Sequence, residues 1–193
     1  MEQKVENSIK KTKEGFEKSF LEGNLYDRQT QDRNHLNKIM ECLHIKSGDR
    51  ILDLGTGSGY LAFEIARKYP DSMVIGLDIV ENALKKNREQ AKTLDLNNIS
   101  FASYGGVEIP FDSSYFDIVV TRYTLHHFPQ IEESFREISR ILKNNGKFFL
   151  ADPTPNYDDT ERFVDAYMQM KKDGHIKYYT KGEFKYRACQ VDM

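Results

Sequence analysis

The chain has 193 residues and a formal net charge of −2. Acidic and basic side chains are nearly balanced, which excludes the strongly basic surface of a duplex nucleic-acid binder. No apolar stretch approaches the ~20 residues of a membrane span, and the two cysteines have no metal-ligand spacing to the five histidines. The sequence therefore predicts a soluble, cytoplasmic protein of one domain, residues 1–193, with no metal and no nucleic-acid partner.

Two helices are expected within residues 1–46, at 3–20 and 29–44, because apolar residues recur there at helical spacing. The loop 23–27 between them carries Tyr26, which either packs on the core or lies over a ligand. The first helix is a candidate lid over a bound ligand. The residues that define the two apolar faces are Val5, Ile9, Phe16 and Phe20 in the first helix and Leu36, Ile39, Met40 and Leu43 in the second.

A buried strand is expected at 50–54, followed by the glycine-rich turn 55–59 and a helix that begins near Leu61. Glycine allows positive φ and lets a ligand approach the backbone closely. The first unpaired N–H groups and the positive dipole end of the helix face the same place. The turn therefore predicts a cradle for an anionic group such as a carboxylate.

Four further strands are expected at 73–78, 99–102, 116–121 and 147–151. Helices alternate with them, first at 81–95 with Ala83, Leu84, Ala91 and Leu94 inward. The next helix begins near Ile131 and stops at 144–146, where Gly146 allows a left-handed cap. Such alternation predicts an α/β fold with a mostly parallel sheet covered on both faces. Ligands bind such sheets outside the carboxyl ends of the strands.

Two acids stand out at these strand ends. Asp78 lies 23 positions after Gly55, close to the offset at which an acid accepts hydrogen bonds from ribose hydroxyls; the alternative is an acid that caps the next helix. Asp53 lies within an apolar strand, where an unpaired charge is costly. Its partner is either the N–H groups of the turn or a bound ammonium group.

The segments 51–59, 109–111, 115–119, 125–128 and 136–146, together with Asp78, resemble those of class I S-adenosylmethionine-dependent methyltransferases. They are most similar to the methyltransferase type 11 group, which includes enzymes of ubiquinone and menaquinone biosynthesis. The resemblance covers residues 48–153. It implies a Rossmann-like, doubly wound sheet of strand order 3-2-1-4-5, with N-terminal cap helices and a shortened C-terminal segment at 154–193. It also implies S-adenosyl-L-methionine as cofactor, S-adenosyl-L-homocysteine as product, and methyl transfer to a small molecule by in-line displacement.

The resemblance also implies a set of cofactor-binding positions. The turn would hold the methionine part with Asp53 near its amino group, Asp78 would bind the ribose, and Ile79 would lie against the adenine. Gly105 stands where the family commonly has an Asp, so adenine recognition would depend on the backbone nearby. The full set is Asp53, Gly55, Thr56, Gly57, Gly59, Asp78, Ile79, Tyr104, Gly105, Gly106 and Arg122.

His126 and His127 are the candidate bases, because a near-neutral imidazole beside the acceptor can take its proton. Packing and hydrogen bonding at a helix start are the alternative roles. Asp152 either reaches the acceptor pocket or makes a turn, and His175 lies in a segment that resembles one found after strand five in some relatives. The acceptor itself is not identified by the sequence.

The C-terminal segment is short for this family. A helix is expected at 158–173 with Phe163, Ala166, Tyr167 and Met170 on one side, and 184–191 has room for one strand at most. An open sheet edge tends to find a partner. We therefore expect either a truncated C-terminus or a homodimer formed through the C-terminal sheet edge.

Two other functions fit parts of the sequence. One is a non-catalytic or regulatory protein that retains the S-adenosylmethionine pocket. The other is a nicotinamide-dependent oxidoreductase, because residues 57–62 match G-x-G-x-x-A and Tyr167 and Lys171 match Y-x-x-x-K. Gly55, the first glycine after the strand, puts that fingerprint out of phase, so the oxidoreductase is the weaker alternative.

Overall fold

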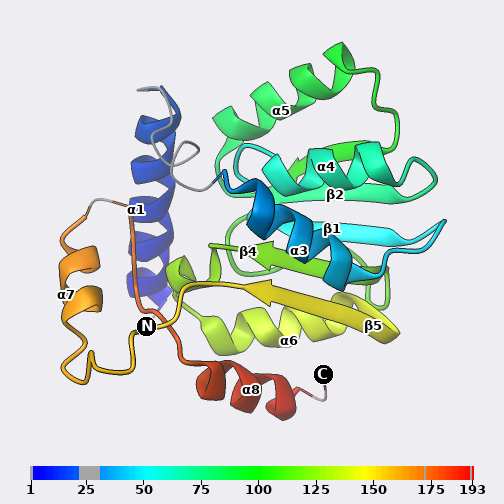
Figure 1. The fold of residues 1–193 in the computed structure, drawn as a ribbon. Helices are drawn as coiled ribbons and strands as arrows, with labels where there is room; N and C mark the ends of the chain where they lie inside the picture. Colours follow the sequence, from blue (N-terminus) through cyan, green and yellow to red (C-terminus); the bar gives the residue numbers. More distant parts are fainter. Residues whose placement is uncertain (1, 22–30, 172, 192) are drawn as a thin grey trace.

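The computed structural model describes residues 2–21, 31–171, 173–191 and 193 (Figure 1). Five parallel strands form one sheet in the order β3-β2-β1-β4-β5, which confirms the predicted doubly wound fold. The strands are β1 (Arg50–Leu54), β2 (Met73–Asp78), β3 (Ile99–Ser103), β4 (Phe116–Arg122) and β5 (Leu142–Ala151). The loop 23–27 lies outside the described residues.

Helices cover both faces of this sheet. One face packs against α3 (Arg33–Leu43), α4 (Tyr60–Lys68) and α5 (Glu81–Thr93), and the other against α6 (Ile131–Ile141). The apolar face expected for the second helix is buried as predicted, through Leu36, Ile39, Met40 and Leu43. Leu94 is an exception: it is 39% exposed because α5 ends one residue before it.

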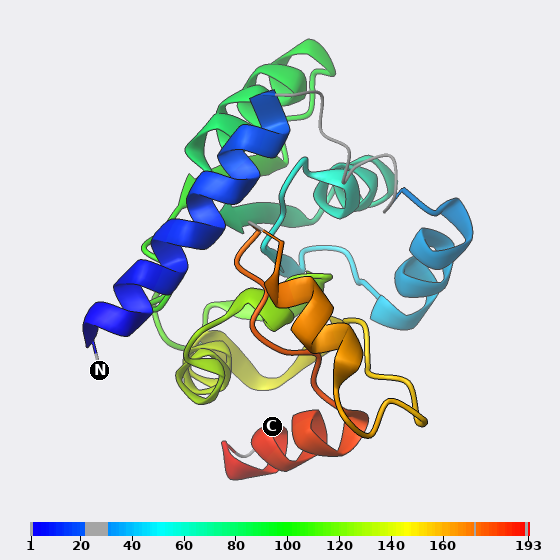
Figure 2. The same cartoon turned by 90° about the vertical axis from the view of Figure 1, so that its left-hand side faces the viewer.

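The first helix does not pack flat on the sheet. α1 (Glu2–Leu21) stands across the ends toward which the strands point, and α7 (Phe163–Gln169) lies on the same side of the molecule (Figures 1 and 2). A short 3-10 helix, η1 (Leu125–His127), follows β4 at the same edge. This arrangement places α1, η1 and α7 around the carboxyl ends of the strands.

The predicted end of α6 is wrong. The helix stops at Ile141, and Leu142 is already extended and pairs with Phe116 of β4. The next residue pair is Ile118 with Lys147, so the chain between them bulges out of the ladder. Asn145, with φ of 66°, takes the left-handed conformation that the sequence analysis assigned to Gly146.

The C-terminal segment also differs from the expectation. Residues 181–190 form a helix, α8 (Lys181–Gln190), where one strand was the limit expected. A capping box between Thr180 and Glu183 begins it, and Phe184 is buried near Phe135 of α6. The predicted apolar side of α7 faces outward: its exposed residues are Phe163 (73%), Tyr167 (56%) and Met170 (80%). Among the described residues, no helix combines the length and apolar character needed to cross a bilayer.

Candidate active site

A cavity of about 780 Å³ opens at the carboxyl edge of the sheet. Its floor comes from the glycine turn after β1, the start of the loop after β2, and the ends of β4 and β5. Its roof comes from α1 and from four residues in and after α7, namely Met168, Lys171, Asp173 and Tyr178. Figure 2 shows α1 and α7 on this side of the molecule. This volume is within the range of sites that enclose a cofactor-sized ligand.

The glycine turn needs its first glycine. Gly55 has φ of 76°, and a Cβ there would lie 2.2 Å from Cγ2 of Thr124. Its N–H and that of Thr56 both donate to the carbonyl of Leu77, at 2.8 and 3.1 Å, which ties the turn to β2. The chain can therefore pass between β2 and the end of β4 only with glycine at this position.

Asp78 holds the turn from the other side. Its carboxylate accepts hydrogen bonds from the N–H groups of Gly57 (2.8 Å) and Val80 (3.0 Å). It lines the cavity although only 8% of the residue is exposed. Burial raises the pKa of Asp78, and the backbone hydrogen bonds oppose that rise. A fixed carboxylate acceptor thus lies directly beside the glycine turn.

Asp53 lies beneath the turn and does not line the cavity. Its carboxylate accepts a hydrogen bond of 2.7 Å from the hydroxyl of Thr56, and 3% of the residue is exposed. Burial raises the pKa of Asp53 to about 6, with repulsion from Asp78 adding to the rise and the Thr56 hydrogen bond opposing it. The partner of Asp53 is thus the hydroxyl of Thr56, which the sequence did not indicate; the expected partners were the N–H groups of the turn or a bound ammonium group.

The buried carboxyl group of Asp53 predicts a pH dependence of stability. Between its ordinary pKa of 3.8 and about 6, the native state binds more protons at Asp53 than the unfolded state does, so the free energy of unfolding falls as pH rises. The loss is about 3 kcal/mol at most. The free energy of unfolding should be measured with denaturant for wild type and Asp53→Asn at pH 4, 5, 6 and 7. The decrease due to Asp53 should appear only in the wild type. The same pH dependence in both proteins would contradict this prediction.

The structure brings most of the predicted positions to the cavity wall. Asp53, Gly59 and Gly105 do not line it. Gly59 instead precedes α4 in the left-handed conformation. The predicted residues that do line it are Gly55, Thr56, Gly57, Asp78, Ile79, Tyr104, Gly106, Arg122, His126 and His127.

His126 and Asp152 form a buried pair at the other end of the cavity from Asp78. Nδ1 of His126 lies 2.6 Å from Oδ1 of Asp152, and the backbone N–H of His126 donates to Oδ2 at 3.0 Å. The two side chains are 7% and 1% exposed. His126 lies in η1, which follows β4, and Asp152 follows β5, so two neighbouring strands position the pair.

His127 and His175 surround this pair, with ring centroids 4.2 and 5.4 Å from that of His126. Burial holds the pKa of His127 well below its usual range, and repulsion from His126 acts in the same direction. Burial also lowers the pKa of His175, although Asp165 accepts a hydrogen bond from its Nε2 at 2.9 Å. In the described part of the chain, no group of three or more His, Cys, Asp or Glu residues is placed to hold a metal ion.

Sequence reasoning missed several residues of the wall. His35, near the start of α3, lies 3.4 Å from Nε of Arg122 and 3.2 Å from the hydroxyl of Tyr123. The Arg122 guanidinium also lies 4.3 Å from the centre of the Tyr123 ring. Only long-range packing brings α3 to the cavity, so the sequence around His35 does not indicate that this residue lines the wall. The other missed wall residues include Thr12, Met168 and Tyr178.

Comparisons with known proteins identify the family. A sequence profile described as a methyltransferase domain matches residues 45–187. The chain belongs to this methyltransferase family. It is 27% identical over 169 residues to the uncharacterized methyltransferase YcgJ of Bacillus subtilis, covering 87% of this chain and 62% of YcgJ. It is 28% identical over 155 residues to demethylmenaquinone methyltransferase of Listeria welshimeri, covering 79% of this chain and 66% of that protein.

Solved structures agree on the fold. The crystal structure of YcgJ superimposes with a TM-score of 0.76 at 24% identity, over 83% of this chain and 68% of that one. The methyltransferase domain therefore has the class I, Rossmann-like architecture related to the quinone-biosynthesis type, as the sequence predicted. It spans about two thirds or less of the length of the curated relatives named above.

Proposed function

We propose that this methyltransferase domain binds S-adenosyl-L-methionine and transfers its methyl group to a small-molecule acceptor by in-line displacement. The observation that supports the proposal is the pairing, in one cavity, of the glycine turn with the carboxylate of Asp78. Among the relatives, one is a demethylmenaquinone methyltransferase by name, which supports a small-molecule acceptor.

The residues of the cavity suit this cofactor. The turn at 55–58 presents backbone groups, and a Cβ at Gly57 would meet open space, so a ligand can approach there. Asp78 supplies acceptors for ribose hydroxyls, Ile79 and Tyr104 line the wall beyond it, and Arg122 would lie at the methionine end. The cofactor supplies an activated methyl group on a sulfonium. The protein's own contribution is alignment of the acceptor within the cavity.

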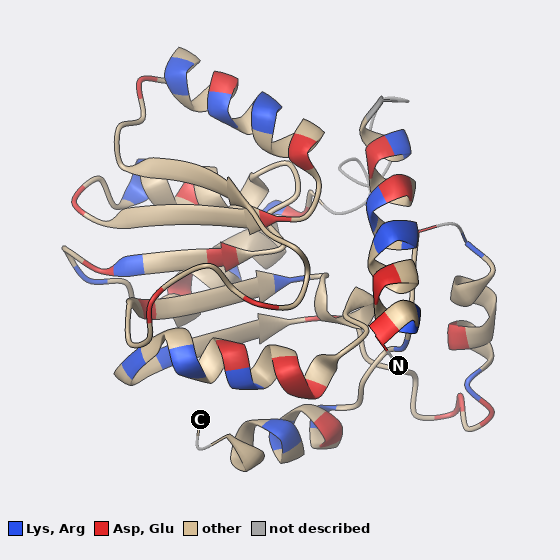
Figure 3. Cartoon of the chain, turned by 180° about the vertical axis from the view of Figure 1, so that it is seen from behind, with Lys and Arg blue, Asp and Glu red and all other residues tan. Residues whose placement is uncertain are grey.

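The acceptor half of the cavity is lined largely by apolar and aromatic residues. Phe16 of α1 meets the ring of His127 edge to face, with 5.1 Å between centroids. Phe128, Pro129 and Met168 line the same region. Charges of both signs are interspersed along α1, α5 and α6 (Figure 3), which favours a small-molecule acceptor over a nucleic acid, because single strands bind in positively charged grooves. A small, mainly apolar acceptor fits this wall.

Calorimetry and a methyl-transfer screen test the proposal together. The wild-type protein should bind S-adenosylhomocysteine and S-adenosylmethionine, and should form S-adenosylhomocysteine from the latter when a suitable small acceptor is present. Failure to bind either nucleoside would overturn the proposal. Tight binding with no turnover across a broad acceptor screen would instead favour the non-catalytic binding protein.

The predicted homodimer stays part of the proposal. Within the described residues, β5 is an edge strand, and α8 contacts α6 and adds no strand to the sheet. An unpaired edge can accept the same edge of a second copy. Light scattering should therefore give about twice the mass of one chain. A strictly monomeric mass across the accessible concentration range would contradict this prediction.

A further inference from the structure

The two adjacent histidines at the cavity wall are not equivalent. We propose that His126 is the base that takes the acceptor's proton during methyl transfer, and that Asp152 is the residue that positions it. This inference rests on the proposed function and identifies the side chain that acts on the methyl acceptor.

The contact with Asp152 fixes which nitrogen of His126 is free. A carboxylate only accepts hydrogen bonds, so the proton of the neutral imidazole lies on Nδ1, 2.6 Å from Oδ1 of Asp152. Nε2 is then left with a lone pair. His126 lines the cavity, and among the described residues no hydrogen bond engages Nε2. An imidazole in this tautomer is ready to accept a proton from a molecule in the cavity.

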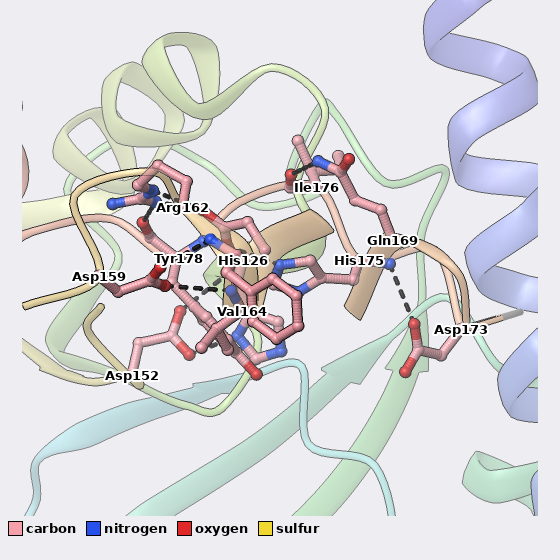
Figure 4. A network of polar contacts seen from close by, with 12 residues as sticks. His126, Asp152, Asp159, Arg162, Val164, Gln169, Asp173, His175, Ile176 and Tyr178 are labelled. Carbon is pink, nitrogen blue, oxygen red and sulfur yellow. Dashed lines mark hydrogen bonds and ion pairs between the residues drawn. The ribbon is translucent and has the colours of Figure 1, made fainter. Parts of the chain in front are cut away.

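The backbone of His126 is clamped from two sides (Figure 4). Its N–H donates to Asp152 Oδ2, and its carbonyl accepts hydrogen bonds from the N–H groups of Ile176 (2.9 Å) and Lys177 (3.3 Å). The first contact comes from the end of β5 and the second from the segment after α7. The ring therefore has a fixed orientation, which is the condition under which a base contributes most to a proton transfer.

The two histidines nearest to His126 lack this arrangement. Nδ1 of His127 is buried with no hydrogen-bond partner in the described structure, and burial keeps the pKa of this ring well below its ordinary value. His175 has a fully buried side chain whose Nε2 is engaged by Asp165. Neither has a carboxylate on one nitrogen and the cavity at the other.

The ionisable groups around His126 come from four places. Asp152 faces it from the end of β5, and His127 from its own helix. His175 and Tyr178 face it from the segment after α7, with ring centroids 5.4 and 5.2 Å away. Asp165, Asp173 and Lys171 lie in a second layer or on the cavity wall. Within the described parts of the chain, Asp152 is the residue that makes a hydrogen bond to the ring, so it decides the tautomer.

The proposed proton transfer applies to an acceptor with an O–H or N–H group. The oxygen or nitrogen forms a bond to the methyl carbon, and the carbon–sulfur bond breaks with its electron pair left on sulfur. The acceptor's proton goes to Nε2 of His126, and the imidazolium is stabilised by Asp152 until solvent takes the proton. The substrate class is thus a weakly acidic hydroxyl or amine. Acceptors without such a proton, such as thioethers, gain nothing from this base.

Activity measurements use variants that preserve the hydrogen bonds. His126→Asn keeps an N–H that can donate to Asp152 and deletes Nε2, and Asp152→Asn keeps the shape of the carboxylate. With S-adenosylmethionine and hydroquinone, 4-nitrocatechol or benzylamine as acceptor, His126→Asn should lower kcat by about 10²–10⁴-fold with little change in KM. Asp152→Asn should lower kcat at least about tenfold and alter the acid limb of the pH profile. His44→Asn, at an exposed histidine after α3, should match wild type.

A second readout needs no turnover. Long-range nitrogen–proton NMR of histidine-labelled protein saturated with S-adenosylhomocysteine should show His126 as the Nδ1–H tautomer. Asp152→Asn should shift His126 toward the Nε2–H tautomer. If Asp152 had only a structural role, wild type and Asp152→Asn would show the same mixture of tautomers. An Nε2–H tautomer in wild type, or unchanged kcat in a folded His126→Asn, would overturn this inference alone. Loss of nucleoside binding by wild type, or binding without product from any probe, would overturn the proposed function as well.

Discussion

Replacing Asp78 by alanine should weaken the binding of S-adenosylhomocysteine by about 100-fold or more. The carboxylate can accept two charge-assisted hydrogen bonds from vicinal hydroxyls, each worth about 1.5–3 kcal/mol, and each 1.4 kcal/mol is about tenfold in affinity. The variant also removes the acceptor for the N–H groups of Gly57 and Val80, so the turn loses its support. Calorimetry of wild type and variant measures the difference directly.

Two further variants separate the lost contacts from a loss of folding. Asp78→Asn keeps the size of the side chain and one carbonyl acceptor, so its affinity should lie between those of wild type and Asp78→Ala. Glu89→Ala, at an exposed acid on α5, should bind as wild type does. Asp78→Ala leaves the N–H groups of Gly57 and Val80 without their acceptor, so its melting temperature should fall, and a cooperative melting transition would show that the variant still folds. Wild-type affinity in Asp78→Ala would remove the basis of the proposed function.

The central fold could be predicted because its signals are local. Each strand is a short apolar run, and the glycines after β1 can serve only a turn that approaches a ligand or another backbone. These patterns located all five strands, α4, α5 and the start of α6. They also indicated the strand ends where most of the cavity wall lies, because a parallel sheet carries its carboxyl ends on one edge.

The pairing of His126 with Asp152 could have been predicted from the strand order. In the order 3-2-1-4-5, β4 and β5 are neighbours, and Arg122 pairs with Ala151 at their ends. Residues that follow these two ends therefore lie close together, although 26 positions separate the histidine from the aspartate. Taken separately, neither residue has a sequence signal that assigns its role.

Other features depended on packing that no local pattern records. The apolar side of α7 faces outward because Asp165, on its opposite side, is engaged by Arg162 and His175. A hydrophobic pattern alone predicts the reverse orientation. α8 was a different case, since Thr180 and Glu183 form a readable capping box at its start. The apolar periodicity of this segment is weak, so it did not predict a helix, and a final strand was expected instead.

The position of α1 over the cavity leads to the second large prediction, a faster release of the nucleoside from Gly174→Ala. Gly174 has φ of 75°, and a Cβ there would lie 2.0 Å from Oγ1 and 2.8 Å from Cα of Thr12 in α1. Because one of these atoms belongs to the helix backbone, a side-chain rotation cannot relieve the overlap. α1 or the segment that holds Gly174 must move, and the contact that closes the roof opens.

The expected result is a rate of S-adenosylhomocysteine dissociation about tenfold higher in Gly174→Ala, measured by surface plasmon resonance. This is the behaviour of a lid, whose opening limits ligand exchange. Gly182→Ala is the matched control, because Gly182 lies in α8, and the nearest atom to its added Cβ is Oγ1 of Thr180 at 3.9 Å. It should leave the dissociation rate unchanged and stabilise the helix by about 0.5–1 kcal/mol. Equal dissociation rates in wild type and Gly174→Ala would mean that α1 is a fixed wall, and that the ligand leaves by a route that does not require the helix to move.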